Sequence, residues 1–393
     1  MSIQLADRTL RVKPSATLAV AAKAAQMRAQ GVDMIDLGLG EPDFDTPDIA
    51  KDAAIKAIQD GFTKYTPVDG IPELKQAIIA KFARDNKLTY TPKQILVSVG
   101  AKHSLYNLTQ ALLNSGDEVI VAAPYWVSYP EFARLADAEP VFIDADIKQD
   151  FKITPKQLAG AITPKTKLLF LNSPSNPTGV TYTLAELKAL GEVLKEHPHI
   201  IIASDDIYEH IFWGDEPFAN ILNACPELYD RTVIINGMSK AYCMTGWRIG
   251  YAAGPEVLIQ AMNKIQSQST SNPCAIAQKA SVAALNMDQS LIQDMVKIFK
   301  ERHDYIVDAL NKIPGFTCVP GQGAFYAFFH AQDFINQHHM KDDVELANYL
   351  IEKAHVALVP GSAFGMPGYL RLSYATSMDN LREAIKRLSA AGQ

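Results

Sequence analysis

The segment NGMSKAYCMTGWRIGY, residues 236–251, places two cations, Lys240 and Arg248, among small and apolar residues. A lysine amine is a nucleophile once it has lost its proton, and a desolvated amine is less easily protonated. An arginine keeps its charge and offers a fixed pair of donors to a phosphate or a carboxylate. Each side chain alone is more simply interpreted as a surface charge. Together they predict a nucleophile beside an anion clamp.

Other polar residues follow the apolar runs that predict buried strands. These runs are ILVSVG (95–100), EVIVAAP (118–124), KLLFLNSP (167–174), HIIIASDD (199–206) and RTVIING (231–237). In open α/β sheets, ligands bind beyond the carboxyl ends of the strands. The residues expected there are Gly100, Ala101, Lys102, Tyr125, Trp126, Ser175, Asn176, Thr178, Asp205, Tyr208, Ser239, Lys240 and Arg248.

The first group of these residues suits a phosphorylated ligand. Gly100, Ala101 and Lys102 open a predicted helix directly after a strand, so their backbone N–H groups would face an anion. Arg248 adds a bidentate phosphate donor, and Lys240 could form a Schiff base with an aldehyde. A phosphate and an aldehyde on one small molecule indicate pyridoxal phosphate (PLP).

The remaining residues suit the ring of the same molecule. Asp205 could pair with a ring nitrogen and keep it protonated. Asn176 and Tyr208 could hold a phenolic oxygen, and Trp126 could stack on the flat ring. PLP is an electron sink in amino-acid chemistry, so the set predicts an enzyme of that class.

Most of these features have an ordinary structural interpretation when taken singly. Trp126 alone is more often a core residue, Asp205 alone is a common capping carboxylate, and Tyr65 alone is a loop aromatic. NPTG (176–179) is a good turn, and LGLG (37–40) is too short for a dinucleotide fingerprint. The functional interpretation rests on their joint occurrence, each after a strand.

Alternating strand and helix patterns must position these residues. From about residue 48, short apolar runs alternate with amphipathic helical patterns, which predicts an α/β fold with a mostly parallel seven-stranded sheet sandwiched by helices. A long helical region over 273–313 is followed by strand-like and helical patterns typical of a smaller α+β domain. We predict an N-terminal segment 1–45 that joins the small domain, a large domain 46–290 and a small domain 291–393.

Composition limits the alternatives. The chain has 393 residues, a formal net charge of −6 and no basic run, which argues against nucleic-acid binding. Four cysteines lack metal-site or CxxC spacing and predict buried free thiols, and no metal site is expected. The first residues do not read as a signal peptide, and no apolar run approaches a membrane span. We therefore expect a cytoplasmic protein that contacts neither membrane nor nucleic acid.

Several motifs together resemble the class I aminotransferases of PLP fold type I, in the bacterial branch of aspartate and aspartate/prephenate aminotransferases. The resemblance covers nearly the whole chain. The motifs that carry it are PSATLAV (14–20), GEPDFDTP (40–47), KYTPVDGIPEL (64–74), PYWVSYP (124–130), NSPSNPTG (172–179), SDDIYEH (204–210), SKAYCMTGWRIGY (239–251) and RLSYATS (371–377). Cys243 and Met238 depart mildly from the pattern without affecting the chemistry.

The resemblance implies roles for individual residues. Lys240 would be the catalytic residue that binds PLP covalently, and Arg371 would bind the substrate α-carboxylate with help from Asn176 and Gly40. Tyr65 would reach the phosphate in a neighbouring subunit, so a homodimer with shared active sites is implied. The expected cofactor residues are Tyr65, Gly100, Ala101, Lys102, Trp126, Asn176, Asp205, Tyr208, Ser239, Lys240 and Arg248. The expected substrate residues are Ser15, Thr17, Gly40, Lys102, Trp126, Asn176 and Arg371.

The predicted reaction is a ping-pong transamination from L-aspartate to 2-oxoglutarate, giving oxaloacetate and L-glutamate, with prephenate as a further candidate substrate. An aromatic aminotransferase or a PLP-dependent β-lyase on the same fold remains open. The substrate end would separate these alternatives, because an acidic substrate needs a second cation. Lys102 is the candidate for that cation, with Ser15 and Thr17 as hydrogen-bond partners. A PLP-sensing transcriptional regulator would need an attached DNA-binding domain, and the roughly 45 residues before the large domain are not basic. A NAD-dependent dehydrogenase would need the glycine fingerprint, which this sequence lacks.

Overall fold

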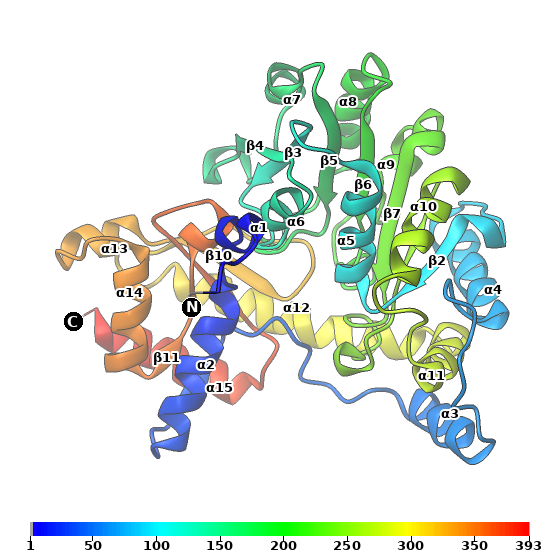
Figure 1. Cartoon of the computed structure of the whole chain (residues 1–393). Coiled ribbons are helices and arrows are strands. Elements are labelled where there is room, and N and C mark those ends of the chain that lie inside the picture. Colours follow the sequence, from blue (N-terminus) through cyan, green and yellow to red (C-terminus); the bar gives the residue numbers. More distant parts are fainter. Residues whose placement is uncertain (1–2, 393) are drawn as a thin grey trace.

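A seven-stranded sheet forms the centre of the protein in the computed structural model, which describes residues 3–392 (Figure 1). The strand order is β2-β8-β7-β6-β5-β3-β4. Strand β8 runs antiparallel to both of its neighbours, β2 and β7, and all the other neighbouring pairs are parallel. The predicted mostly parallel sheet is therefore confirmed. Its strands are β2 (Ile95–Ser98), β3 (Glu118–Ala123), β4 (Glu139–Asp144), β5 (Thr166–Asn172), β6 (Ile201–Asp205), β7 (Thr232–Gly237) and β8 (Gly250–Ala253).

Helices cover both faces of this sheet, which explains why its strands read as continuous apolar runs. Successive residues of β5 enter different cores: Leu168 and Phe170 pack on one face, and Leu169 and Leu171 on the other. Helices α5, α6 and α10 contribute to the first core, and α4, α8 and α11 to the second. The predicted sandwich is thus present, and it buries both faces of each central strand.

The helices of the described chain are distributed along the whole sequence. They are α1 (Asp7–Arg11), α2 (Ala16–Ala29), α3 (Asp48–Gln59), α4 (Pro72–Lys81), α5 (Ala101–Leu112), α6 (Tyr129–Leu135), α7 (Pro155–Ala161), α8 (Leu184–Lys195), α9 (Ile221–Ala224), α10 (Glu256–Ser267), α11 (Ala275–Asn286), α12 (Ser290–Leu310), α13 (Gln332–Gln337), α14 (Asp343–Tyr349) and α15 (Met378–Ala391).

A second, antiparallel sheet lies in the C-terminal part, with the order β12-β13-β10-β9. A short parallel pair, β1 with β11, attaches the N-terminal segment to this part, beside α2 (Figure 1). The division into 1–45, 46–290 and 291–393 stays a prediction. The strands are β1 (Ile35–Asp36), β9 (Thr317–Cys318), β10 (Tyr326–His330), β11 (Val356–Ala357), β12 (Val359–Pro360) and β13 (Tyr369–Ser373).

Two details differ from the sequence-based expectations. The helical region predicted over 273–313 is two helices, α11 and α12, because the Asp288 carboxylate accepts hydrogen bonds from the amide and hydroxyl of Ser290 at the break. All four cysteines are free, but Cys274 is exposed and only Cys225 and Cys318 are buried. Within residues 3–392, no helix combines the length and apolar character needed to cross a membrane.

Candidate active site

A cavity of about 280 Å³ opens at the carboxyl edge of the large sheet. Strands β3, β5, β6 and β7 are parallel, and β2 has the same direction because β8 is antiparallel to both β2 and β7. The residues that follow these strands therefore meet at one edge, as predicted. Those that line the cavity are Ala101, Lys102, Trp126, Asn176, Asp205, Tyr208, Ser239, Lys240 and Arg248, and they are joined by Thr17, Gly40 and Arg371.

Lys240 lies deep in this cavity, in the turn that follows β7. Its Nζ donates a 2.5 Å hydrogen bond to the Gly40 carbonyl and lies 5.7–5.9 Å from the ring centres of Tyr208 and Phe325. Burial, together with the positive charge of Arg371, lowers the Lys240 pKa to about 8. The amine is thus neutral more often near pH 7 than an exposed lysine, as a nucleophile and proton carrier must be.

Asp205 ends β6, and its carboxylate is buried. Tyr129 on α6 donates a 2.7 Å hydrogen bond to Oδ2, and the Ile207 amide donates to Oδ1 at 3.3 Å. Burial raises the Asp205 pKa to about 6, although these two bonds and the charge of Lys240 act to lower it. A carboxylate that is costly to keep charged in this setting favours a nearby cation, such as a protonated ring nitrogen.

An anion cradle forms where α5 begins. The amides of His103 and Ser104 donate to the Gly100 carbonyl, which leaves the earlier amides of Ala101 and Lys102 for a ligand. Gly100 has φ +82°, and a Cβ there would lie 2.4 Å from Arg248 Nη2. The missing side chain lets the guanidinium approach the start of α5. Arg248 is itself fixed by a 2.8 Å hydrogen bond from Nη1 to the Thr245 carbonyl.

Arg371 approaches the cavity from β13 of the smaller sheet and is 2% exposed. It donates from Nη1 to Asn176 Oδ1 at 2.9 Å and from Nη2 to the Gly38 carbonyl at 2.6 Å. Its buried Nε has no hydrogen-bond partner within the described residues. Burying an unpaired guanidinium N–H is costly, so this group favours a ligand carboxylate.

The residues predicted for the far end of a substrate are partly brought together. Lys102 and Thr17 both line the cavity, and Lys102 Nζ lies 5.0 Å from the ring centre of Trp126. Burial and the charge of Arg248 lower the Lys102 pKa. Ser15 does not line the cavity, but its hydroxyl contacts that of Thr17 at 2.8 Å. Ser15 can thus act through Thr17.

Two predicted cofactor residues do not line the cavity of this single chain. Gly100 is not a lining residue, but its backbone packs against the Arg248 guanidinium and so helps to form the cradle. Tyr65 lies in the loop between α3 and α4, and its side chain is 92% exposed. The exposed Tyr65 side chain is therefore available to a second chain, and it does not contribute to the cavity of its own chain.

Sequence reasoning missed two tyrosines of the site. Tyr129 lies in the quoted motif PYWVSYP, three residues after Trp126, and its place in a motif already linked to the site is a signal that could have found it. Tyr326 follows a glycine-rich segment at the start of β10, and its hydroxyl lies 2.8 Å from that of Tyr208. No local pattern indicates Tyr326, because β10 reaches the cavity only through the tertiary fold. Other lining residues that were not predicted are Leu18, Gly38, Leu39, Glu41, Leu105, Asn172, Ile207 and Thr245.

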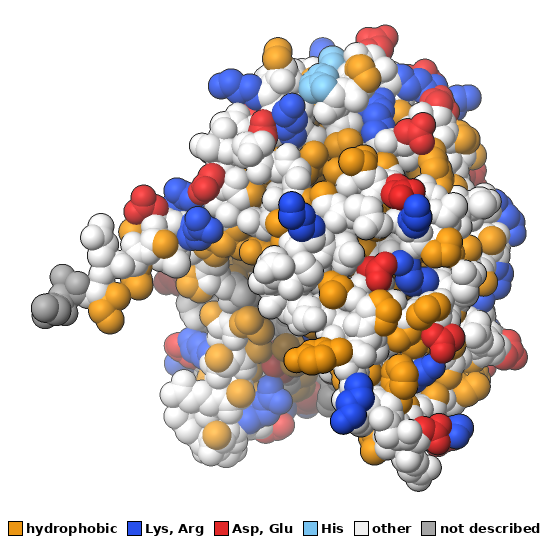
Figure 2. Space-filling model, turned by 45° about the vertical axis from the view of Figure 1, so that its right-hand side comes forward, with side chains coloured by type: hydrophobic (Ala, Val, Ile, Leu, Met, Phe, Trp, Pro, Cys, Tyr) orange, Lys and Arg blue, Asp and Glu red, His pale blue; other side chains and the backbone are white. Residues whose placement is uncertain are grey.

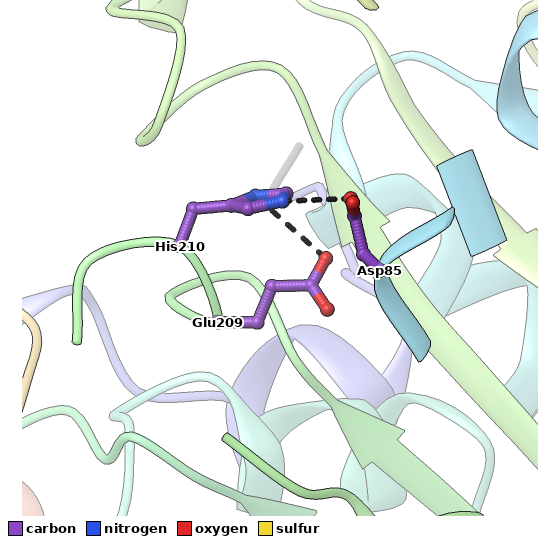
Figure 3. A group of neighbouring side chains, drawn as sticks. All are labelled: Asp85, Glu209 and His210. Carbon is purple, nitrogen blue, oxygen red and sulfur yellow. Dashed lines mark hydrogen bonds and ion pairs between the residues drawn. The ribbon is translucent and has the colours of Figure 1, made fainter. Parts of the chain in front are cut away.

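A separate polar cluster contains Asp85, Glu209 and His210 (Figure 3). His210 Nε2 lies 2.9 Å from Asp85 Oδ2, and its Nδ1 lies 3.8 Å from Glu209 Oε1. Lys81 also pairs with Glu209, and Arg84 with Asp85, so cations already neutralise both carboxylates. Burial would raise the Glu209 pKa, yet the charges of Lys81 and His210 hold it below its usual value.

This cluster supports the site from behind. Asn236 of β7 donates a 2.6 Å hydrogen bond to Glu209 Oε1. Glu209 directly follows Tyr208, and Asn236 precedes Lys240 by four residues. The network therefore ties the segment that carries Tyr208 to the strand that presents Lys240, which is a structural function with no ion required.

Comparison with known proteins identifies the family. The family model "Aminotransferase class I and II" matches residues 32–388. The chain belongs to this family. An aminotransferase acts on amino-acid and 2-oxo-acid substrates, and Lys240 and Arg371 both line the cavity. The family resemblance and the fold predicted from the motifs are thereby confirmed.

Individual aminotransferases resemble the chain along its whole length. It is 56% identical to "Aspartate/prephenate aminotransferase" of Nitrosomonas europaea over 99% of both chains. It is 53% identical to "Aspartate aminotransferase" of Geobacillus stearothermophilus over 98% of both. Among solved structures, the aspartate aminotransferase of Rhizobium meliloti has a TM-score of 0.96 at 46% identity, with 100% of this chain and 99% of that chain covered.

Proposed function

We propose that this aminotransferase uses PLP to transfer the amino group of L-aspartate to 2-oxoglutarate, giving oxaloacetate and L-glutamate in a ping-pong reaction. The observation that carries the proposal is the meeting of Lys240, buried Asp205 and the Gly100–Arg248 cradle in one cavity. The full-length relatives named for aspartate support the substrate.

The residues present fit PLP by charge and by shape. The cradle formed by the Ala101 and Lys102 amides and by Arg248 suits a phosphate. The Arg248 guanidinium occupies this place because Gly100 has no Cβ that would clash with it. The Asp205 carboxylate suits a protonated ring nitrogen, and Trp126 offers an aromatic face at the same cavity. Asn176 and Tyr208 supply donors for the ring oxygen.

When bound, PLP supplies an aldehyde for the amino group and a ring that accepts the electrons released at the substrate Cα. With PLP bound, Lys240 Nζ would be the base that takes the proton from the substrate Cα and the acid that delivers it to the former aldehyde carbon of the cofactor. Asp205 keeps the proton on the ring nitrogen. Arg371 would hold the α-carboxylate through its unpaired Nε and the N–H groups that Asn176 and Gly38 leave free, and this contact would orient the substrate for Lys240.

Selection of an acidic side chain falls to Lys102 in this proposal. The other three cations of the cavity, Lys240, Arg248 and Arg371, each donate a hydrogen bond to the protein. Within the described residues, the Lys102 amine has no such acceptor, so it is available to a ligand carboxylate. Thr17, backed by Ser15, adds a hydroxyl from the N-terminal segment. An aromatic aminotransferase or a β-lyase would not need this cation.

Prephenate is a second candidate amino-group acceptor. It carries two carboxylates and a six-membered hydrocarbon ring with one hydroxyl. Leu18 and Leu39 line the cavity and are 68% and 45% exposed, so an apolar surface lies beside the polar groups that would bind the carboxylates. Relatives from Nitrosomonas europaea and Cereibacter sphaeroides, 56% and 53% identical, are named for both substrates.

Three further assignments complete the proposal. The active form is a homodimer in which Tyr65 reaches the partner's phosphate site, the enzyme acts in the cytoplasm, and the domain boundaries lie near residues 45 and 290. Ile49, Ile55 and Ile58 on α3 are exposed apolar residues in the same part of the chain as Tyr65, and the face seen in Figure 2 carries many such side chains between its charges. A second copy would cover them.

A substrate panel tests the function. Purified protein supplied with PLP and 2-oxoglutarate should form glutamate much faster from L-aspartate than from L-alanine or L-phenylalanine. In the reverse assay, with glutamate as donor, oxaloacetate and then prephenate should serve as acceptors. Equal or faster reaction with phenylalanine than with aspartate would contradict the assignment, and pyruvate formation from a β-substituted amino acid without an acceptor would indicate a lyase.

A further inference from the structure

We propose that Tyr326 is a positioning residue that links the carboxylate anchor Arg371 to the cofactor anchor Tyr208. The inference rests on the proposed function, because it concerns how the chain controls bound PLP. Three contacts carry it, and all three involve the same side chain at the start of β10, which is 1% exposed and lines the cavity.

The first contact joins the two phenols. The hydroxyl oxygens of Tyr208 and Tyr326 are 2.8 Å apart, and either could donate. When Tyr208 donates to the ring oxygen of PLP, its own oxygen is left to accept. Tyr326 then becomes the donor, and the two hydroxyls form a chain that points at the cofactor. A hydroxyl that accepts a hydrogen bond donates its own proton more strongly.

The second contact places a cation on the ring of the same residue. The Arg371 guanidinium carbon lies 4.5 Å from the Tyr326 ring centre, in the geometry of a cation–π interaction. Burial raises the Tyr326 pKa, and the charge of Arg371 acts against that rise. Arg371 thereby makes the Tyr326 hydroxyl a better donor to Tyr208.

The third contact fixes the hydroxyl in place. A Cβ on Gly40 would lie 2.5 Å from Tyr326 Oη, so the Gly40 backbone packs directly against this oxygen. The Gly40 carbonyl accepts the hydrogen bond of Lys240. One phenol thus touches the segment that holds the nucleophile, the residue that holds the ring oxygen and the residue that binds the substrate carboxylate.

The chain has a consequence for the proton on Lys240 Nζ. In PLP-linked Lys240, the proton on Nζ would stabilise the negative charge of the ring oxygen. Other hydrogen-bond donors to that oxygen stabilise the charge after the proton has left, so they favour the form in which Nζ is deprotonated. Tyr326 strengthens such a donor and should lower the pKa of the linkage. A carboxylate that binds Arg371 neutralises the cation over Tyr326, weakens the chain and should raise the same pKa.

The test is the pH titration of the visible absorbance of the PLP-loaded protein, with and without saturating maleate as an unreactive dicarboxylate. Tyr326→Phe should raise the midpoint by about half a unit and Tyr208→Phe by about one unit or more. Tyr326→Phe should also shrink the rise that maleate causes. The matched control is Tyr374→Phe, since the buried Tyr374 hydroxyl has no hydrogen-bond partner in the described chain and lies outside the cavity lining.

The combination Tyr208→Phe/Tyr326→Phe separates the chain from a direct contact. If Tyr326 acts through Tyr208, its removal shifts the midpoint no further once Tyr208 is absent. An unchanged midpoint in Tyr326→Phe, an equal shift in Tyr374→Phe, or a full second shift in the double variant would each overturn the inference. A wild-type protein that PLP cannot colour would instead overturn the proposed function. If Tyr326→Phe cannot be loaded, the maleate-induced rise is measured in Tyr208→Phe, where a wild-type rise contradicts the chain.

Discussion

At the scale of single residues, burial gives the two central ionisable groups opposite shifts. The Lys240 pKa falls to about 8 and the Asp205 pKa rises to about 6, with desolvation as the largest cause in each case. Between these values, Asp205 becomes mostly charged, and the neutral fraction of Lys240 rises to about half at the upper end. Pairs of groups with displaced pKa values are typical of acid–base catalysis, and near neutral pH each group is available for its proposed role.

Asp205→Asn tests the carboxylate without changing its shape. The amide keeps a hydrogen-bond acceptor for Tyr129 but cannot hold a proton on the ring nitrogen, so we expect kcat for aspartate to fall by about 10²-fold or more with little change in KM. Steady-state kinetics on protein saturated with PLP measures both constants. A variant with normal kcat would show that Asp205 does not serve the cofactor.

Residue types and their places after apolar runs were enough to predict the residues expected to bind PLP. Lys240, Asp205, Asn176 and Arg248 follow apolar runs, and the sheet rule brings such positions together. Arg371 required the family resemblance, since no spacing relates β13 to the large sheet. Neither the strand-end rule nor the family resemblance predicted Tyr326, because its hydroxyl meets that of Tyr208 only after β10 has packed across the cavity.

At the scale of elements, the first turn of α5 supplies both the cradle and the proposed selectivity. Lys102→Ala would leave the side-chain carboxylate of aspartate unpaired, at a cost of about 2–5 kcal/mol. We expect kcat/KM for aspartate and glutamate to fall by roughly 10²-fold or more, while the value for alanine or phenylalanine changes little. Equal losses for acidic and apolar substrates would place Lys102 at the phosphate instead.

The glycine before α5 is a second test of this element. Gly100→Ala forces an L side chain to φ +82° and pushes Arg248 Nη2 away, so PLP affinity should fall about tenfold or more and stability by about 1–3 kcal/mol. Gly116→Ala is the control, because Gly116 has φ +87° but nothing within 4 Å of an added Cβ. PLP titration and thermal unfolding separate strain from the loss of the cradle. Wild-type PLP affinity in Gly100→Ala would be inconsistent with the proposed cradle.

The elements themselves were largely predictable. Strands buried on both faces left uninterrupted apolar runs, and β2, β3, β5, β6 and β7 were found from them. The break between α11 and α12 was not, because MDQS (287–290) contains neither glycine nor proline, and the start of α12 is marked only by the hydrogen bonds from Ser290 to the Asp288 side chain. The pairing of β1 with β11 joins residues more than 300 positions apart, and no local pattern encodes it.

At the scale of the whole molecule, the exposed Tyr65 and the apolar outer side of α3 predict a dimer with shared sites. Tyr65→Ala and Lys240→Ala proteins should each be impaired alone. Unfolded together and refolded, they should recover about one quarter of wild-type activity, since about half of the dimers are hybrids and each hybrid has one intact site. Activity no greater than the sum of the two separate variants would contradict a shared site.

The account as a whole depends on Lys240 carrying out both covalent capture and proton transfer. The most direct measurement adds L-aspartate, without a 2-oxo acid, to protein loaded with PLP, and follows the visible absorbance and the oxaloacetate formed. We predict that the visible band disappears and that about one oxaloacetate forms per site, and that 2-oxoglutarate then restores the band. Lys240→Ala should bind PLP without showing this reaction at a comparable rate. Rapid conversion of aspartate by Lys240→Ala, or a wild-type band that aspartate leaves unchanged, would contradict the account.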